Sequence, residues 1–324
     1  MADQHGSSRS SAHVERDPLI AAIATFLAGQ DARTLELIRH SLEIEIDRAG
    51  ADALGRLGAR LAAAGTDWDF YPRDPLVRRI HHVLADFILM QDSTLYGVEH
   101  LASVADKPVV IFANHLSYAD ANLLEVLLQR AGGSTLSDRL TVIAGPKVYS
   151  SLKRRFSSLC FGTIKTPQSR ALSSEEAVMN AREIARAARL SIDIAHERLR
   201  LGEALLIFAE GTRSRSRGMQ PLLASVTRYL DCPDVWVLPV GITGTEALFP
   251  IGEDTLHPVR AVSRVGRPIQ ASVLRQRAAG DRRLMMDGVG LAIAGLLPPE
   301  YRGAYGDDVA NLVDARRVLR TLYD

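Results

Sequence analysis

The pattern of apolar and polar positions changes character close to Pro108. Before that point, apolar residues recur three and four positions apart, as Leu35, Ile38, Leu42 and Ile46 do, and this spacing places them on one face of a helix. Beyond it, short β-branched runs alternate with longer helical patterns. The first 16 residues hold no apolar run and are expected to be disordered. We therefore expect three parts, which are a disordered tail at 1–16, an N-terminal helical section at 17–92 and an α/β domain at 93–324.

The alternation beyond Pro108 predicts strands and helices in turn. The expected strands are Val109–Ala113, Leu140–Ala144, Ala204–Ala209, Val235–Ile242 and Val259–Val265. The expected helices are Ala121–Arg130, Ser174–Leu201 and Leu222–Leu230. Such alternation is typical of an α/β fold with a mostly parallel central sheet flanked by helices. Ligands bind beyond the carboxyl ends of the strands in such sheets, so the residues that follow each strand are candidates for a functional site.

Composition narrows the class of protein. Apolar residues make up 47% of 324, which is enough for a substantial core. The net charge of +1 argues against a nucleic-acid binder. From Lys147 to Arg217, however, fourteen Lys and Arg stand against seven Asp and Glu. These charges either cover solvated helix faces or attract an anionic substrate or membrane surface.

No segment predicts a membrane span or a secreted protein. The polar stretch Met1–Arg16 is not a secretory signal, and no apolar run approaches the roughly 18 residues of a spanning helix. Cys160 and Cys232 form no metal-spaced pair and fit a reducing cytosol. We expect a cytoplasmic protein that is soluble or peripheral on the inner face of the membrane. The helices at 17–92 either form a bundle over the main domain, which we favour, or rest partly on the bilayer.

The string Asn114-His115-Leu116-Ser117-Tyr118-Ala119-Asp120 follows the first expected strand. A histidine ordinarily titrates near neutral pH, so His115 can remove the proton of a hydroxyl as that hydroxyl attacks. Such a base works best when a carboxylate fixes its tautomer, and Asp120 is close enough in sequence to do so. The spacing of Ser117 and Asp120 also fits a capping box at the start of the next helix, and the two roles are compatible.

The string Phe208-Ala209-Glu210-Gly211-Thr212-Arg213-Ser214 follows a later strand. The glycine lets backbone N–H groups approach an anion, and the guanidinium of Arg213 matches phosphate oxygens. Glu210 is expected to orient Arg213 or the loop. A weaker glycine turn contains Gly162 and Lys165, with Arg170 nearby.

Together these strings resemble the PlsC-like glycerolipid acyltransferase superfamily, the lysophosphatidate and glycerol-3-phosphate acyltransferases. His115 and Asp120 match its H-x4-D motif, and residues 208–214 match its F-P-E-G-T-R-S motif with Ala209 in place of proline. Pro239-Val240-Gly241 matches its fourth block, and a proline inside a strand suggests an edge, a bulge or a bend. The turn Gly266-x-Pro268-Ile269 matches its late G-x-P-I motif.

The resemblance implies an enzyme that moves a fatty acyl group from acyl-CoA or acyl carrier protein to a hydroxyl of a lysophospholipid such as 1-acylglycerol-3-phosphate. His115 would act as general base with Asp120, without an acyl-enzyme. The acceptor phosphate would be bound by Glu210, Gly211, Thr212, Arg213 and Lys165. No metal and no cofactor is implied beyond the thioester co-substrate. Two alternatives stay open, which are a non-glycerolipid acceptor (an amino lipid, glycolipid or secondary metabolite) and a non-catalytic lipid-binding protein.

Overall fold

The computed structural model describes residues 14–27, 31–64, 67–167, 179–250 and 256–323. Most of the expected tail, Arg170 and the first residues of the helix expected from Ser174 lie outside the described residues. The division into three parts therefore stays a prediction.

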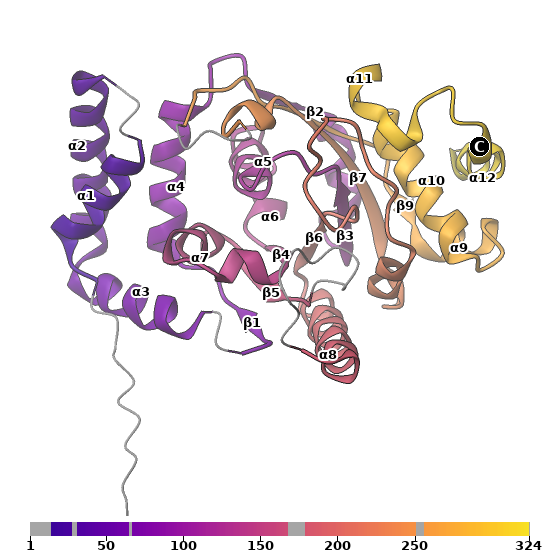
Figure 1. Ribbon diagram of the computed structural model, residues 1–324, viewed down its shortest axis with the longest axis horizontal. Coiled ribbons are helices and arrows are strands. Elements are labelled where there is room, and N and C mark those ends of the chain that lie inside the picture. The colour runs from indigo at the N-terminus through magenta and orange to yellow at the C-terminus, as the bar shows by residue number, and fades with distance from the viewer. Residues whose placement is uncertain (1–13, 28–30, 65–66, 168–178, 251–255, 324) are drawn as a thin grey trace, which may run out of the picture.

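The described residues form a central sheet of mostly parallel strands (Figure 1). Its strands are β1 (Phe70–Tyr71), β2 (Thr94–Tyr96), β3 (Val109–Ala113), β4 (Leu140–Ala144), β5 (Gly162–Lys165), β6 (Ala204–Ile207), β7 (Trp236–Thr243), β8 (Val262–Val265) and β9 (Ile269–Gln270). Their order is β1-β5-β4-β6-β3-β7-β8-β2, and β9 also pairs with β7. The β5-β4-β6-β3-β7 core and the β8-β2 pair are parallel, whereas β1, β8 and β9 run antiparallel to their neighbours β5 and β7. The predicted α/β fold is confirmed.

Helices cover both faces of this sheet. They are α1 (Arg16–Phe26), α2 (Ala32–Ala49), α3 (Ala51–Ala63), α4 (Pro75–Ile88), α5 (Asp120–Arg130), α6 (Ser134–Ser137), α7 (Leu152–Ser158), α8 (Ala181–Arg200), α9 (Ala271–Arg277), α10 (Arg282–Ala294), α11 (Pro299–Arg302) and α12 (Val313–Tyr323). Short 3-10 turns include η3 (Pro146–Tyr149), η5 (Ala224–Leu230), η6 (Thr245–Ala247) and η7 (Gly303–Tyr305).

Strand β3 shows why both faces are covered. All five of its residues are buried, and alternate side chains enter different cores because successive side chains of a strand point to opposite faces. Val109, Ile111 and Ala113 join the core beneath α1, α2, α4 and α5. Val110 and Phe112 join the core beneath α9, α10 and α12. A run buried on both sides is expected for a central parallel strand.

Pro239 does not lie at an edge of the sheet, which excludes one of the three alternatives that its sequence position left open. It lies inside β7, opposite Phe112 of β3. On the other side of β7, Trp236 and Val237 pair with β9, and residues from Val240 onward pair with β8. Pro239 therefore occupies the point where the neighbouring strand changes, and its carbonyl accepts the N–H of Gly266 at 2.8 Å. A missing backbone N–H costs least at such a junction.

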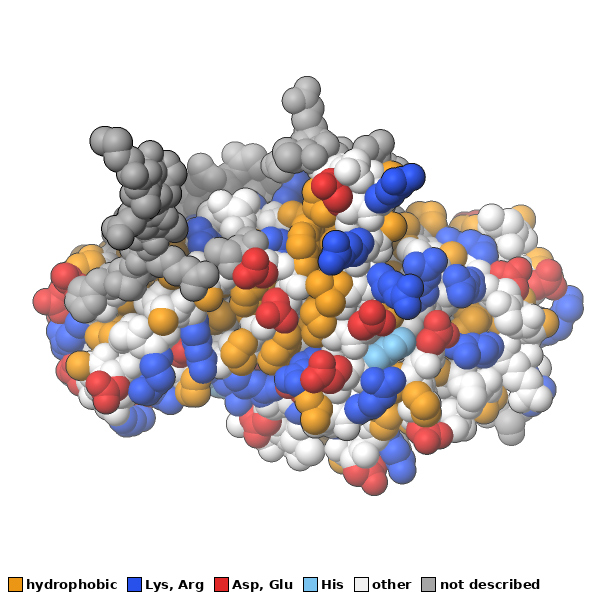
Figure 2. All heavy atoms as spheres, turned by 90° about the horizontal axis from the view of Figure 1, so that it is seen from below, with side chains coloured by type: hydrophobic (Ala, Val, Ile, Leu, Met, Phe, Trp, Pro, Cys, Tyr) orange, Lys and Arg blue, Asp and Glu red, His pale blue; other side chains and the backbone are white. Residues whose placement is uncertain are grey.

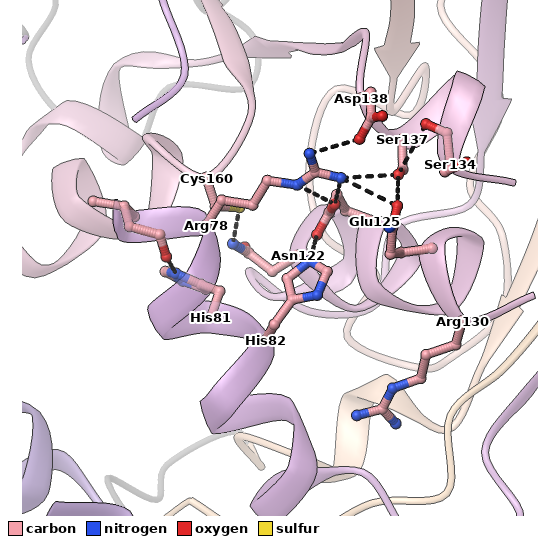
Figure 3. A network of polar contacts seen from close by, with 12 residues as sticks. Arg78, His81, His82, Asn122, Glu125, Arg130, Ser134, Ser137, Asp138 and Cys160 are labelled. Atoms are coloured by element: carbon pink, nitrogen blue, oxygen red, sulfur yellow. Dashed lines mark hydrogen bonds and ion pairs between the residues drawn. The ribbon is translucent and has the colours of Figure 1, made fainter. Parts of the chain in front are cut away.

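A buried polar network attaches the N-terminal helices to the sheet domain (Figure 3). Glu125 on α5 is 0% exposed. Its carboxylate accepts from Arg78 Nε at 2.8 Å and pairs with His82 Nε2 at 2.9 Å, both on α4. Arg78 also pairs with Asp138 at 2.7 Å. Because a buried carboxylate is tolerated only when it is paired, this network fixes the docking of α4 on α5.

No helix in the described part of the chain is long and apolar enough to cross a membrane.

Candidate active site

The carboxylate of Asp120 holds the turn between β3 and α5 together. It is 0% exposed. Its Oδ2 accepts from His115 Nδ1 at 2.9 Å and from the backbone N–H groups of Leu116 and Ser117 at 2.7 and 2.9 Å. Its Oδ1 accepts the hydroxyl of Thr245 at 2.5 Å. Because the carboxylate is the acceptor, Nδ1 of His115 carries the proton, and Nε2 is the nitrogen left to act as a base.

Helix α5 begins at Asp120, two residues later than a capping box started by Ser117 would require. Half of that box is nevertheless present, because Asp120 binds the N–H of Ser117. The hydroxyl of Ser117 accepts the N–H of Ala119 at 3.3 Å instead of that of Asp120. Asp120 thus supports the turn and holds His115 at once, as the sequence allowed.

The backbone of His115 is bound on both sides by the second motif. Its N–H donates to Glu210 Oε1 at 2.8 Å, and its carbonyl accepts the N–H of Ser214 at 2.8 Å. The His115 ring stacks on Phe208 with 4.3 Å between ring centroids. The two motifs therefore form one unit at the carboxyl ends of β3 and β6.

Glu210 holds the loop and does not line the cavity beside His115. It is 2% exposed, and its Oε2 accepts the N–H of Gln220 at 2.7 Å. Burial raises the pKa of this carboxyl to about 7, although the two backbone donors lower it. The placement fits the expectation that Glu210 orients the loop, and gives it no direct contact with a ligand in that cavity.

A cavity of about 420 Å³ opens beside His115. Gly211, Thr212 and Arg213, which are the residues expected to bind a phosphate, line it. Its charged lining consists of cations alone among the described residues: Lys147, Arg154, Arg213 and Arg228. Apolar side chains from β4, α8 and the start of η5 line another part of it, among them Val142, Ile143, Ile184, Ile192, Leu223 and Val226. The cavity therefore offers an anion site next to an apolar site.

Arg154 is a candidate binding residue that sequence reasoning missed. Its guanidinium carbon lies 4.8 Å from the centroid of the Tyr118 ring, and that of Arg213 also lies 4.8 Å from it. Arg154 is further held by the carbonyl of Lys147 at 3.1 Å. Its sequence setting, a basic run on α7, is that of an ordinary solvated helix. Only the packing of α7 beside Tyr118 reveals it.

Two more missed residues, Thr245 and Asn114, support the site from behind. The hydroxyl of Thr245 reaches Asp120 from the end of β7. The side-chain amide of Asn114 donates to the carbonyl of Ile242 at 2.9 Å and accepts its N–H at 2.7 Å. The position of Asn114 next to His115 could have indicated a supporting role for Asn114. Nothing in the sequence linked Thr245 to Asp120.

Lys165 is not among the residues that line the cavity. Its ammonium lies 4.7 Å from the centroid of the Trp68 ring and 5.4 Å from that of Tyr149, and burial lowers its pKa. The structure thus brings His115, Asp120 and residues 210–213 together and leaves Lys165 apart, so its phosphate role stays a prediction. Among the described residues, no group of three or more His, Cys, Asp or Glu could hold a metal ion.

Comparison with protein families identifies the class. Residues 92–243 match the family model described as Acyltransferase, and they contain both motifs. The predicted acyltransferase is confirmed over these residues, which make up a little under half of the chain.

Among solved structures, the chain is similar to the crystal structure of the 1-acyl-sn-glycerophosphate (LPA) acyltransferase, PlsC, from Thermotoga maritima. The two share 18% sequence identity with a TM-score of 0.48, over 87% of this chain and 96% of that chain. No curated protein matched the chain.

Proposed function

We propose that this acyltransferase moves a fatty acyl group from an acyl thioester, carried by CoA or acyl carrier protein, to the hydroxyl of a lysophospholipid such as 1-acylglycerol-3-phosphate. The observation that carries the proposal is the His115–Asp120 pair beside a cavity whose charged lining, in the described part of the chain, consists of cations. A base next to an anion site suits a phosphorylated acceptor whose hydroxyl must be activated.

The chemistry is one direct transfer. Nε2 of His115 takes the proton of the acceptor hydroxyl as its oxygen attacks the thioester carbonyl. The new C–O bond forms, the C–S bond breaks, and the imidazolium returns the proton to the departing thiolate. Asp120 stabilises the imidazolium throughout. Because the acceptor oxygen attacks the thioester carbonyl directly, no acyl-enzyme forms. The scheme uses the thioester as co-substrate and calls for no metal or cofactor.

The acceptor phosphate is proposed to bind between Arg213 and Arg154, with the N–H groups of Gly211 and Thr212 nearby. Gly211 has φ of 74°, a left-handed conformation that favours glycine and lets the backbone approach an anion. Two guanidiniums on one tyrosine ring also match the two negative charges of a phosphate monoester. The acyl chain is assigned to the apolar part of the cavity, between the sheet and α8.

The cavity mouth is proposed to face an anionic membrane surface on the cytoplasmic side. Residues 146–158 and 211–220 contain no Asp or Glu and hold seven cations, namely Lys147, Lys153, Arg154, Arg155, Arg213, Arg215 and Arg217. Leu152 beside them is 58% exposed. Figure 2 shows one face of the molecule, on which Lys and Arg lie among Asp, Glu and hydrophobic side chains. A single-sign field next to exposed apolar side chains favours adsorption to anionic lipid.

A second candidate function keeps this mechanism and changes the acceptor to an amino lipid, a glycolipid or a secondary metabolite. One observation favours it, which is that Lys165 does not line the cavity. The cations of the cavity then differ from those expected for a glycerol phosphate acceptor, because Lys165 was among the expected ones. A non-catalytic lipid-binding role has no such support, since His115 and Asp120 are joined as a base requires.

Product analysis tests the proposal. The protein would be incubated with acyl-CoA or acyl carrier protein and, separately, with lysophosphatidate, a lysophospholipid diester, an amino lipid or a glycolipid, and the lipids identified by mass. We expect phosphatidate from lysophosphatidate. Acylation of the amino lipid or glycolipid alone would establish the second candidate. No acylated product from any pair would contradict both.

A further inference from the structure

Residues 301–305, a C-terminal segment that lies outside the matched range 92–243, are hydrogen-bonded to the loop that carries Arg213. The N–H of Met219 donates to the carbonyl of Tyr301 at 3.0 Å, and the carbonyl of Met219 accepts the N–H of Ala304 at 2.8 Å. Met219 is 3% exposed and packs with Tyr301 and Tyr305 in one core. Both backbone groups of Met219 are thus held by residues 301–304.

Tyr305 adds a third attachment. Its ring is 2% exposed, and its hydroxyl accepts the N–H of Leu222 at 2.9 Å. Arg283 from α10 donates to the carbonyl of the same Leu222 at 2.6 Å and to the Tyr305 hydroxyl at 3.1 Å. The loop is therefore bound on both sides of Gln220, whose own N–H reaches Glu210.

Gly303 lets the two segments approach closely. A Cβ on Gly303 would lie 2.3 Å from the carbonyl oxygen of Met219 and 2.5 Å from its nitrogen. Real Cβ atoms do not come so near backbone, and φ at Gly303 is 48°. Any side chain here would push the loop away from the C-terminal segment.

Short hydrogen-bonded steps connect this grip to the site. Gly218, next to Met219, accepts the hydroxyl of Ser214 at 2.8 Å. The N–H of Ser214 donates to the carbonyl of His115 at 2.8 Å. Arg213 directly precedes Ser214, the residue that both of these bonds hold. Its ring partner, Tyr118, is 44% exposed, so the loop backbone is what fixes Arg213.

Side chains also connect the C-terminal segment to the Arg213 loop, through Glu246. The hydroxyl of Tyr301 donates to Glu246 Oε1 at 2.6 Å, and Arg217 pairs with the same oxygen at 3.3 Å. Arg217 has φ of 67°, which is unfavourable for a residue with a side chain. Such a conformation persists when the surroundings fix it, and Glu246 and the grip on Met219 do so.

We propose that residues 301–305 form a positioning clamp that sets the Arg213 loop for the acceptor phosphate, with Gly303 and Tyr305 as its key residues. The proposal rests on the proposed function, because it takes Arg213 as the phosphate ligand. Since a shift of about 1 Å in a charged contact costs much of its binding energy, the clamp governs acceptor affinity and leaves donor affinity alone.

The test compares Gly303→Ala with Gly295→Ala, a matched control in the same C-terminal helices. A Cβ on Gly295 would meet nothing closer than 3.5 Å. Tyr305→Phe is the second variant, because it keeps the ring and removes the hydroxyl. KM for acceptor and donor, kcat, Tm and hydrogen exchange of residues 210–222 would be measured for each.

We expect Gly303→Ala and Tyr305→Phe to raise the acceptor KM about tenfold, the equivalent of one weakened charged contact, with donor KM within about twofold. Exchange of residues 210–222 should quicken in both variants and stay unchanged in Gly295→Ala. Should Gly303→Ala fail to fold, Tyr305→Phe decides. A fall in Tm with acceptor KM and loop exchange like those of Gly295→Ala would overturn the clamp. Absence of transfer by the wild type would overturn the proposed function alone, because loop exchange still tests the clamp.

Discussion

The backbone N–H of His115 donates to the side chain of Glu210, 95 residues further along the chain, at 2.8 Å. This bond joins the histidine of the first motif to the carboxylate of the second. It explains why a glutamate is needed in a loop whose other members suit an anion. The carboxylate serves the histidine, and the residues after it face the cavity.

Glu210 gives the stability of the protein a specific pH dependence. Its pKa is raised from 4.5 to about 7 in the folded protein, so folding favours the protonated form. The contribution to stability is fully present below pH 4.5 and is lost as pH rises through about 7. As pH rises from about 4.5 to about 7, the Tm of the wild type should therefore fall relative to the Tm of Glu210→Gln. Thermal unfolding of both proteins across this pH range measures the difference. A difference that is constant with pH would contradict the assignment.

Thr245 should matter for turnover although it touches no substrate. Thr245→Val removes the hydroxyl that donates to Asp120 Oδ1, so His115 is oriented less firmly. We expect kcat to fall about tenfold, with both KM values little changed. Thr243→Val is the matched control, since the hydroxyl of Thr243 donates to the carbonyl of Val262 at 3.3 Å and not to Asp120. Equal kcat in the two variants would show that the bond to Asp120 does not aid catalysis.

Arg154 should contribute to acceptor binding as Arg213 does. Arg154→Ala removes a guanidinium from the cavity, and we expect acceptor KM to rise by about tenfold or more, the equivalent of a charged hydrogen bond. The rise in acceptor KM should be larger for a phosphate monoester than for a diester, because the diester carries one negative charge less. Arg189→Ala, which removes an exposed cation of α8 that does not line the cavity, is the control. An acceptor KM that matches this control would remove Arg154 from the phosphate site.

The α4–α5 network should dominate the docking of the N-terminal helices. Arg78→Ala takes a cation from Glu125, which is 0% exposed, and we expect a loss of about 3 kcal/mol in the free energy of unfolding. Arg130→Ala breaks an exposed pair with Asp86 and should cost less than about 1 kcal/mol. Urea denaturation of both variants measures the difference. Similar losses would mean that the buried pair is not what holds α4.

The sequence predicted the parts of this molecule that local patterns determine. The strands β3 and β4 begin and end where expected, because continuous apolar runs between turn residues mark buried parallel strands. The helix expected at Leu222–Leu230 is a 3-10 turn that begins at Ala224, since the preceding residues are bound to the C-terminal segment.

Residues that act across the fold could not be predicted in the same way. Thr245 lies 125 positions from Asp120, and no pattern in either segment signals their hydrogen bond. Arg154 lines the cavity although it was not predicted to do so, and Lys165 was predicted to bind the phosphate but does not line the cavity. Both are cations near a candidate site, and only the packing of α7 and β5 decides which one reaches the cavity.

Acceptor-dependent thiol release tests the central claim most directly. Wild type and His115→Ala would be given acyl-CoA or acyl carrier protein, with and without lysophosphatidate, and free thiol would be followed with time. We expect thiol release that requires lysophosphatidate in the wild type and falls at least about a thousandfold in His115→Ala, while the variant still binds the donor. Release that persists in His115→Ala, or that is independent of acceptor in the wild type, would contradict direct transfer with His115 as the base.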